Sequence, residues 1–87
     1  MPETEIATAL GAIEAGEFRP GPELEVAHHI CQRHEGDPPF DWIHALVHRI
    51  EGDTSNADYW YRRAGRPRHP GPVAEEWQAI ADALGIR

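Results

Sequence analysis

The sequence predicts an all-α fold in which about five short helices form a compact bundle. The chain has 87 residues, one domain's worth of polypeptide, so we treat residues 1–87 as a single helical domain. Most of its eight prolines and eight glycines fall at residues 18–22, 36–39, 52–53 and 65–72, and these places divide the chain into five segments. Apolar residues recur in the segments at helical spacing, and no segment has the alternating pattern of a strand.

The composition is close to the limit for folding. Leu, Ile, Val and Phe make up only 16 of the 87 residues in a chain whose net charge is −7, and both features are typical of disordered chains. Twelve alanines and three tryptophans offset them, because alanine favours helix and each tryptophan can bury a large apolar surface. We therefore expect a folded domain with a thin core, to which self-association as a homodimer or larger homo-oligomer would add buried surface.

The first two helices are predicted over residues 3–16 and 22–35. In the first, Ile6, Leu10 and Ile13 repeat at i, i+4 and i+7, which is the spacing of one helix face. The apolar face predicted for the second comprises Val26, Ala27, Ile30 and Cys31, with Leu24 at its edge.

The third helix, residues 39–51, is the most hydrophobic and is expected at the centre of the fold. Its broad apolar face comprises Phe40, Ile43, Leu46, Val47 and Ile50. Gly52 ends it, and Asp53 or Thr54 is expected to cap a fourth helix over residues 55–64. One side of that helix is made by Ala57, Trp60, Tyr61 and Ala64. The short link predicts that the two helices pack as an antiparallel pair.

A fifth helix is predicted over residues 72–84, after a stiff proline-rich linker over residues 67–72. Its apolar stripe comprises Val73, Trp77, Ile80 and Leu84. Gly85 followed by Ile86 fits a left-handed helix end that is closed by a hydrophobic contact.

The turn between the third and fourth helices resembles the second half of a tetratricopeptide repeat. The residues that carry this likeness are Gly52, Asp53, Ala57, Tyr61 and Ala64. It covers residues 41–64 and departs from the repeat where His44, Ala45 and His48 stand at positions that are usually Leu, Gly and Tyr. The chain holds no second copy, so the resemblance implies a single tetratricopeptide-like helix pair and not a solenoid.

Residues 44–65 more closely resemble a small family of uncharacterised proteins. The shared block is His-Arg-x-Glu-Gly-Asp…Asn-Ala…Tyr-Trp, carried here by His48, Arg49, Glu51, Gly52, Asp53, Asn56, Ala57, Tyr59 and Trp60. This resemblance implies no established function.

Candidate metal ligands lie along the third helix at spacings of three, four and three residues. They are Asp41, His44, His48 and Glu51. Two imidazoles at i and i+4 can bind one divalent metal such as zinc from a single helix, and carboxylates one turn away can complete or orient the ligand set. His28, His34 or a second subunit could supply a further ligand.

Two alternatives to a metal remain open for this stripe. The histidines can be half-buried structural residues that are hydrogen-bonded to the carboxylates, which is the commoner outcome, or one can act as an acid or base near its neutral pKa. A metalloprotease is not expected, because Ala45 stands where the general-base glutamate would be.

A second candidate site, for a ligand or a protein partner, lies at the end of the fourth helix. It comprises Tyr59, Trp60, Arg62, Arg63 and Arg66. Three consecutive aromatic residues cannot all face one core, and an exposed tyrosine beside arginine is favoured at binding surfaces. The alternative for Tyr59 is that it lies across a neighbouring helix with its hydroxyl satisfied.

The arginines of this region are the chain's only basic concentration. Residues 1–60 hold 12 acids and 3 arginines, a charge of −9, whereas residues 61–87 hold 3 acids and 5 arginines, a charge of +2. Guanidinium groups could bind a phosphate or carboxylate ligand, or the acidic half of another copy, but we favour salt bridges within or between subunits. The net negative charge makes a nucleic-acid partner unexpected.

Several chemistries are excluded or unexpected. All eight basic residues are arginine, so a lysine-ended phosphate loop and a Schiff base are excluded. Cys31 lies three residues from both His28 and His34, which permits a thiolate–imidazole pair, but a buried inert thiol is expected. Ser55 is the only serine and suits helix capping. We assign no catalytic residue.

The expected cellular compartment follows from the single cysteine and from the lack of long apolar segments. A single cysteine allows no internal disulfide, and no long apolar run or leader marks a membrane partner or export, so a cytoplasmic location is expected. The use of Arg, Ala, Gly and Pro indicates a bacterial source. The functional hypothesis is a small helical binding or adaptor module without a cofactor that contacts a protein or itself, and the alternative is a metal-binding protein that uses the stripe on the third helix.

Overall fold

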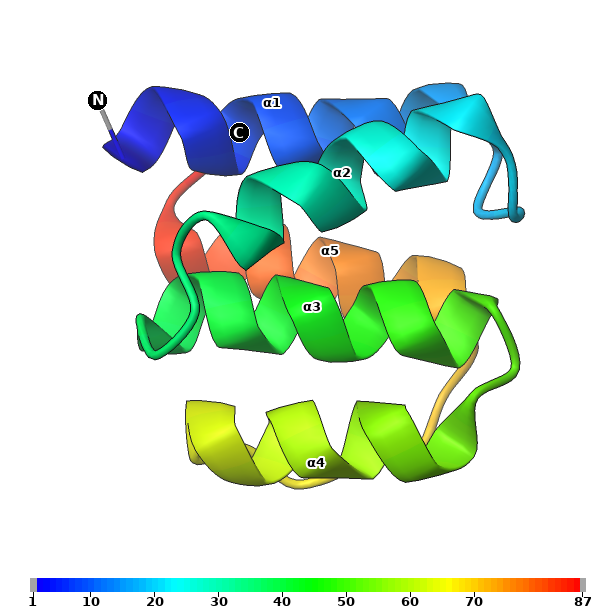
Figure 1. Cartoon of the computed structure of the whole chain (residues 1–87), viewed down its shortest axis with the longest axis vertical. Helices are drawn as coiled ribbons and strands as arrows, with labels where there is room; N and C mark the ends of the chain where they lie inside the picture. Colours follow the sequence, from blue (N-terminus) through cyan, green and yellow to red (C-terminus); the bar gives the residue numbers. More distant parts are fainter. Residues whose placement is uncertain (1, 87) are drawn as a thin grey trace.

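Helix α3 lies at the centre of a computed structural model that describes residues 2–86 (Figure 1). The helices are α1 (Pro2–Ala15), α2 (Pro22–Gln32), α3 (Pro38–Ile50), α4 (Thr54–Ala64) and α5 (Val73–Leu84). Residues 2–86 contain no strand, so the predicted all-α class is confirmed. None of the five helices combines the length and the apolarity needed to cross a bilayer.

The helices are arranged as two antiparallel hairpins and a fifth helix. α1 pairs with α2, α3 pairs with α4, and α5 runs behind α3 in the view of Figure 1. α3 packs against each of the other four helices. The antiparallel packing expected for the third and fourth helices is present, while the tetratricopeptide likeness of that pair stays a prediction.

The burial of α3 follows from its central place. Residues 40–48 are all buried, so the helix is covered on every side and not only along its apolar stripe. Three of these nine residues are polar: Asp41, His44 and His48. Buried polar groups need partners inside the protein, and their contacts therefore define the candidate site.

The helix ends follow the predicted capping chemistry. Asp53 caps α4, and one of its carboxylate oxygens accepts a hydrogen bond from the amide of Asn56. Gly65 and Gly85 end α4 and α5 with φ of 71°, a left-handed conformation that disfavours residues with a β-carbon. The amide of Ile86 closes the last turn of α5 at 2.8 Å, as its position after Gly85 predicts.

Two details predicted for the second helix are wrong. The helix ends at Gln32 and not at residue 35, because the amides of Arg33 and His34 bond to carbonyls three residues earlier and tighten the chain into a turn. Val26 is 47% exposed, whereas Leu24 is 2% exposed. The buried stripe runs through Leu24, Ala27 and Cys31 at i, i+3 and i+7, because α1 and α3 together cover that side of α2.

Candidate functional site

Three histidines from two helices meet between α2 and α3. His44 and His48 lie one turn apart on α3, and their rings stack with centroids 5.0 Å apart. His28 comes from α2, and its Nε2 lies 3.1 Å from Nε2 of His44. One potential ligand atom from each of the three rings lies within 4.8 Å of the other two. The structure therefore joins the predicted histidine pair to one of the further donors named from the sequence.

The hydrogen bonding of these rings leaves nitrogen lone pairs inside the cluster. Two Nε2 atoms 3.1 Å apart can hold only one proton between them, so one of the two rings offers a bare lone pair to the other. Nδ1 of His44 is buried and has no hydrogen-bond partner. The protein alone thus leaves His44 incompletely satisfied, which is unusual for a histidine with a purely structural role.

Burial favours the neutral form of two of the three rings, those of His28 and His44. Burial lowers the pKa of His44 to about 3, and the neighbouring His28 and His48 add to this effect. Burial also lowers the pKa of His28, with a further contribution from His48. A neutral imidazole is the form that binds metal ions, so the lowered pKa values of His28 and His44 favour the form of these two rings that a metal requires.

Carboxylates surround the histidines on the more exposed side of the cluster. Oε1 of Glu51 lies 3.0 Å from Nδ1 of His48, a contact that orients the ring and leaves its other nitrogen for the cluster. Glu25 and Glu51 also have ligand oxygens within 4.8 Å of a ring nitrogen of His28. Trp60 forms the floor, since its ring stacks on His44 with centroids 3.9 Å apart.

Asp41, the remaining residue of the predicted stripe, points away from the histidines, toward the turn before α3. Side chains on a helix lean toward its N-terminus, and Asp41 accordingly meets the turn before α3, where one oxygen accepts a hydrogen bond of 3.1 Å from the amide of Gly36. Its other oxygen is buried without a partner, and burial raises the pKa of the carboxyl. His34, also named as a donor, lies 2.9 Å from Glu5 and stacks on Phe40.

The structure brings three of the five residues of the predicted partner site together: the guanidinium carbon of Arg63 lies 5.6 Å from the Tyr59 ring centroid and 5.4 Å from that of Trp60. Trp60 is buried beneath the histidines, whereas Tyr59 is 42% exposed and its hydroxyl accepts a hydrogen bond of 2.7 Å from Arg63. Arg62 is exposed near the end of α4. Arg66 belongs to the loop that follows α4, and its guanidinium carbon lies 4.0 Å from the centroid of the Trp42 ring.

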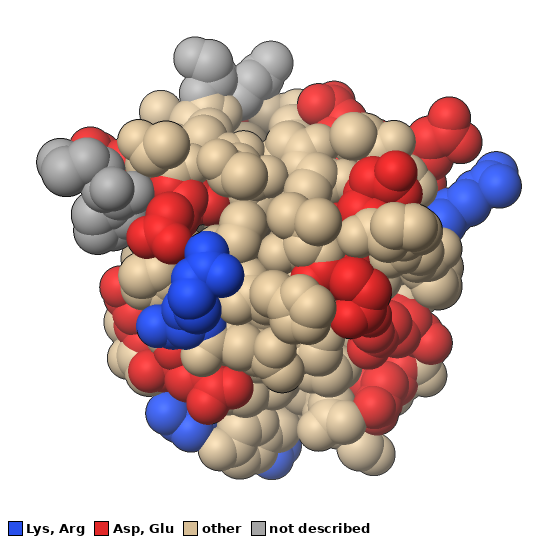
Figure 2. All heavy atoms as spheres, turned by 45° about the horizontal axis from the view of Figure 1, so that its top comes forward, with Lys and Arg blue, Asp and Glu red and all other residues tan. Residues whose placement is uncertain are grey.

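The charge distribution agrees in part with the internal salt bridges that we favoured. Arg68 binds Asp58 through two hydrogen bonds of 3.1 and 2.6 Å, and this pairing lowers the pKa of Asp58. Arg33 pairs with Glu5 and so joins the turn after α2 to α1. On the face that Figure 2 brings forward from the top of Figure 1, acidic side chains nevertheless cover more of the surface than basic ones.

Glu76 is a buried polar residue that the sequence analysis missed. Its carboxylate is fully buried in α5 and accepts hydrogen bonds from Trp42 at 3.1 Å, Arg49 at 2.8 Å and Tyr61 at 2.6 and 2.8 Å. Burial and the bond to Glu76 raise the pKa of Tyr61. An acidic residue in the first turn of a helix is ordinarily solvated, so its position gave no signal of this role.

The residues weighed for nucleophilic chemistry are inert or exposed. Burial, with the nearby Asp41, raises the pKa of Cys31 to about 12, so this thiol stays protonated at neutral pH. Its neighbours His28 and His34 are engaged with His44 and Glu5. Ser55 lies exposed in the first turn of α4.

Comparison with known proteins gives no match: no protein-family model fits the chain, and no curated protein or solved structure is significantly similar to it. The two resemblances stated from the sequence therefore stay predictions.

Proposed function

We propose that this protein binds a divalent transition metal through His28, His44 and His48. The observation that carries the proposal is the convergence of three imidazole nitrogens, one from α2 and two from α3, within 4.8 Å of one another. Imidazole is a ligand of Zn²⁺, Cu²⁺ and Ni²⁺, and carboxylates that orient metal-binding histidines are a regular feature of such sites.

The spacing of the nitrogens supports a tetrahedral ion. Nitrogens bound to zinc at about 2.0–2.1 Å in a tetrahedron lie about 3.3 Å apart. The closest pair here is 3.1 Å apart, so the third nitrogen has to move by no more than about 1–2 Å. Glu25 and Glu51 form a second group with His28 alone, so either of them would have to move toward His44 and His48 to provide a fourth ligand.

Zinc titration of protein purified without a histidine tag and stripped with chelator tests the proposal. We expect one Zn²⁺ per chain and an increase in the free energy of unfolding of about 2.7 kcal/mol at a free zinc concentration a hundred times the dissociation constant. The substitution His28→Ala removes the one histidine ligand that α2 provides and should abolish this increase. His29→Ala is the matched control, because His29 is the next residue and its side chain is 66% exposed.

A second variant separates loss of a ligand from loss of folding. His48→Ala should also lose zinc, and the far-ultraviolet circular dichroism of each metal-free variant reports whether it is folded. The visible absorption of Co²⁺ in place of Zn²⁺ gives an independent measure of a tetrahedral site. Stoichiometric zinc in folded His28→Ala and His48→Ala proteins, or no zinc in the wild-type protein, would contradict the proposal.

A protein-binding or adaptor function is the second candidate. It is favoured by Tyr59, which is the one large aromatic residue that α4 exposes, and by the adjacent Arg63, whose guanidinium lies 5.6 Å from the Tyr59 ring centroid. If this surface supports self-association, sedimentation velocity should give a dimer for the wild-type protein and a monomer for Tyr59→Ala, both in chelator. A monomer in both cases would remove self-association through α4.

A further inference from the structure

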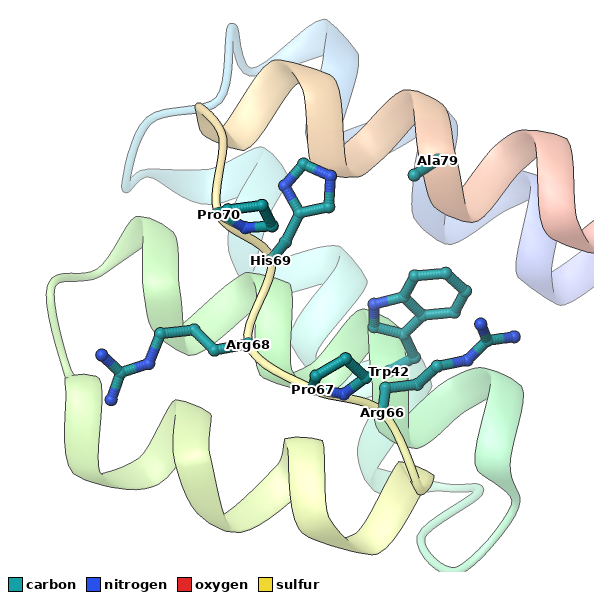
Figure 3. Close-up of a pocket in the computed structure, with 7 residues that line it drawn as sticks. All are labelled: Trp42, Arg66, Pro67, Arg68, His69, Pro70 and Ala79. Atoms are coloured by element: carbon teal, nitrogen blue, oxygen red, sulfur yellow. The ribbon is translucent and has the colours of Figure 1, made fainter.

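A cavity lies between α3, the loop after α4 and α5, and none of the residues that line it is His28, His44 or His48. Its volume is about 240 Å³, and it is lined by Trp42, Arg66, Pro67, Arg68, His69, Pro70 and Ala79 (Figure 3). The indole ring, the two prolines and the alanine make most of its wall apolar. A cavity below the usual range for drug-sized ligands suits a molecule of about one ring.

Arg66 gives this apolar cavity a positive charge that the protein does not neutralise. In Figure 3 the Arg66 side chain lies alongside Trp42, whereas that of Arg68 points away from the cavity, toward its ion pair with Asp58. Among residues 2–86, no carboxylate forms an ion pair with Arg66. A guanidinium left unpaired in a chain of net charge −7 is available to an external carboxylate.

His69 provides a second donor to the same cavity. The amide of Gly71 donates a hydrogen bond of 3.1 Å to Nδ1 of His69, so in the neutral ring the proton resides on Nε2. His69 lines the cavity from the side opposite the Arg66 guanidinium in Figure 3, and Trp42 lies between them in that view. The Trp42 ring thus lies between the two groups, with the Arg66 guanidinium carbon over one of its faces, 4.0 Å from the ring centroid, and His69 on the other side in that view.

The floor of the cavity is held in place before any ligand arrives. The indole nitrogen of Trp42 donates to the buried Glu76, which fixes the ring. A smaller hollow of about 100 Å³ adjoins Trp42 and Arg66 on the side of Leu84 and leaves the Arg66 side chain room to adjust. A fixed aromatic wall reduces the cost of ordering a bound ligand, whereas Arg66 has to be immobilised when it binds the carboxylate.

We infer that the cavity beside Trp42 and Arg66 binds a small aromatic carboxylate, whose ring contacts Trp42 and the prolines and whose carboxylate binds Arg66. A phosphate or other compact anion fits less well, because it would leave the apolar walls uncovered. The inference does not depend on metal binding, since no residue is shared with the histidine cluster.

Nuclear magnetic resonance with benzoate as the probe tests this inference. The indole N–H signal of Trp42 is the reporter, and the signals of Trp60 and Trp77 in the same spectrum are internal controls. We expect a saturable shift of the Trp42 signal with a dissociation constant of about 1 mM or less. Benzamide, which has the same shape without the charge, should bind about tenfold more weakly.

The matched variants are Arg66→Gln and Arg19→Gln. Arg66→Gln should weaken benzoate binding about tenfold, whereas Arg19→Gln should leave it unchanged, because Arg19 is exposed in the turn after α1 and does not line the cavity. Circular dichroism of both variants reports on folding. Equal binding of benzoate and benzamide, an unchanged affinity in folded Arg66→Gln, or no Trp42 shift well above 1 mM benzoate would each overturn the inference.

Discussion

The Glu76 carboxylate is fully buried and accepts hydrogen bonds from Trp42 and Arg49 on α3 and from Tyr61 on α4. Arg49 also donates to the carbonyl of Gly71, so one ion pair connects α3, α5 and the loop between α4 and α5. Removing one partner of a buried ion pair leaves the other charge buried and uncompensated, and this lowers the free energy of unfolding.

We predict that Glu76→Gln lowers the free energy of unfolding by about 3–5 kcal/mol, because it leaves Arg49 without its counter-ion and brings an amide N–H among donors. Urea denaturation followed by circular dichroism measures this loss. Glu75→Gln is the matched control, since Glu75 is the preceding residue, is exposed, and should tolerate the change with little effect. A Glu76→Gln protein as stable as the control would mean that the network adds nothing to stability.

Sequence patterns predicted some of these residues and could not predict others. The spacing of His44 and His48 is visible in the sequence because both lie on one helix, and their approach is confirmed. His28 could be named only as one donor among several, because the approach of α2 to α3 depends on tertiary packing. The sequence around Glu76 did not indicate its burial, because the residues that bind its carboxylate lie at least 15 positions away in the chain.

At the level of single helices, periodicity and capping residues predicted which segments are helical. Tertiary contacts decided which face of a helix is buried. Proline, glycine and aspartate mark the helix ends because they act within a few residues. The buried face of α2 was displaced from the prediction because two neighbouring helices cover it, and a helical wheel contains no information about neighbours.

The turn between α2 and α3 gives a prediction of pH dependence. Burial raises the pKa of Asp41 above its ordinary value of 3.8, so the folded protein holds this proton more tightly than the unfolded chain. The contribution of Asp41 to stability is therefore greatest below the ordinary pKa and declines as the pH rises through the folded pKa. Asp41→Asn keeps an oxygen for the amide of Gly36 and removes this titration.

We therefore expect the stability of the wild-type protein, relative to Asp41→Asn, to decrease as the pH rises from acid to neutral. Thermal melts of both proteins in chelator, at several pH values over that range, measure the difference. Glu14→Gln serves as a control, because Glu14 is an exposed carboxylate on α1 and is not among the groups that raise the pKa of Asp41. A difference that grows in favour of the wild-type protein with rising pH would contradict this account.

On the scale of the whole molecule, one set of buried residues unites all five helices. α3 contacts every other helix, and apolar residues of all five belong to one core cluster. The indole nitrogen of Trp77 on α5 also donates a hydrogen bond of 2.8 Å to the carbonyl of Leu10 on α1, which links the last helix to the first. A low content of large aliphatic residues is thus compensated by concentrating them around one central helix.

This shared core predicts that the protein unfolds in a single cooperative transition. All three tryptophans lie on α3, α4 and α5, so their fluorescence reports on those helices, whereas far-ultraviolet circular dichroism also reports α1 and α2. The two signals should follow the same urea curve in chelator, because α1 and α2 have no separate core. Trp77→Phe removes the bond to Leu10 and should lower the free energy of unfolding by about 1 kcal/mol while the two curves stay superimposed. A circular dichroism transition that precedes the fluorescence transition would instead mean that α1 and α2 detach before the remaining helices unfold.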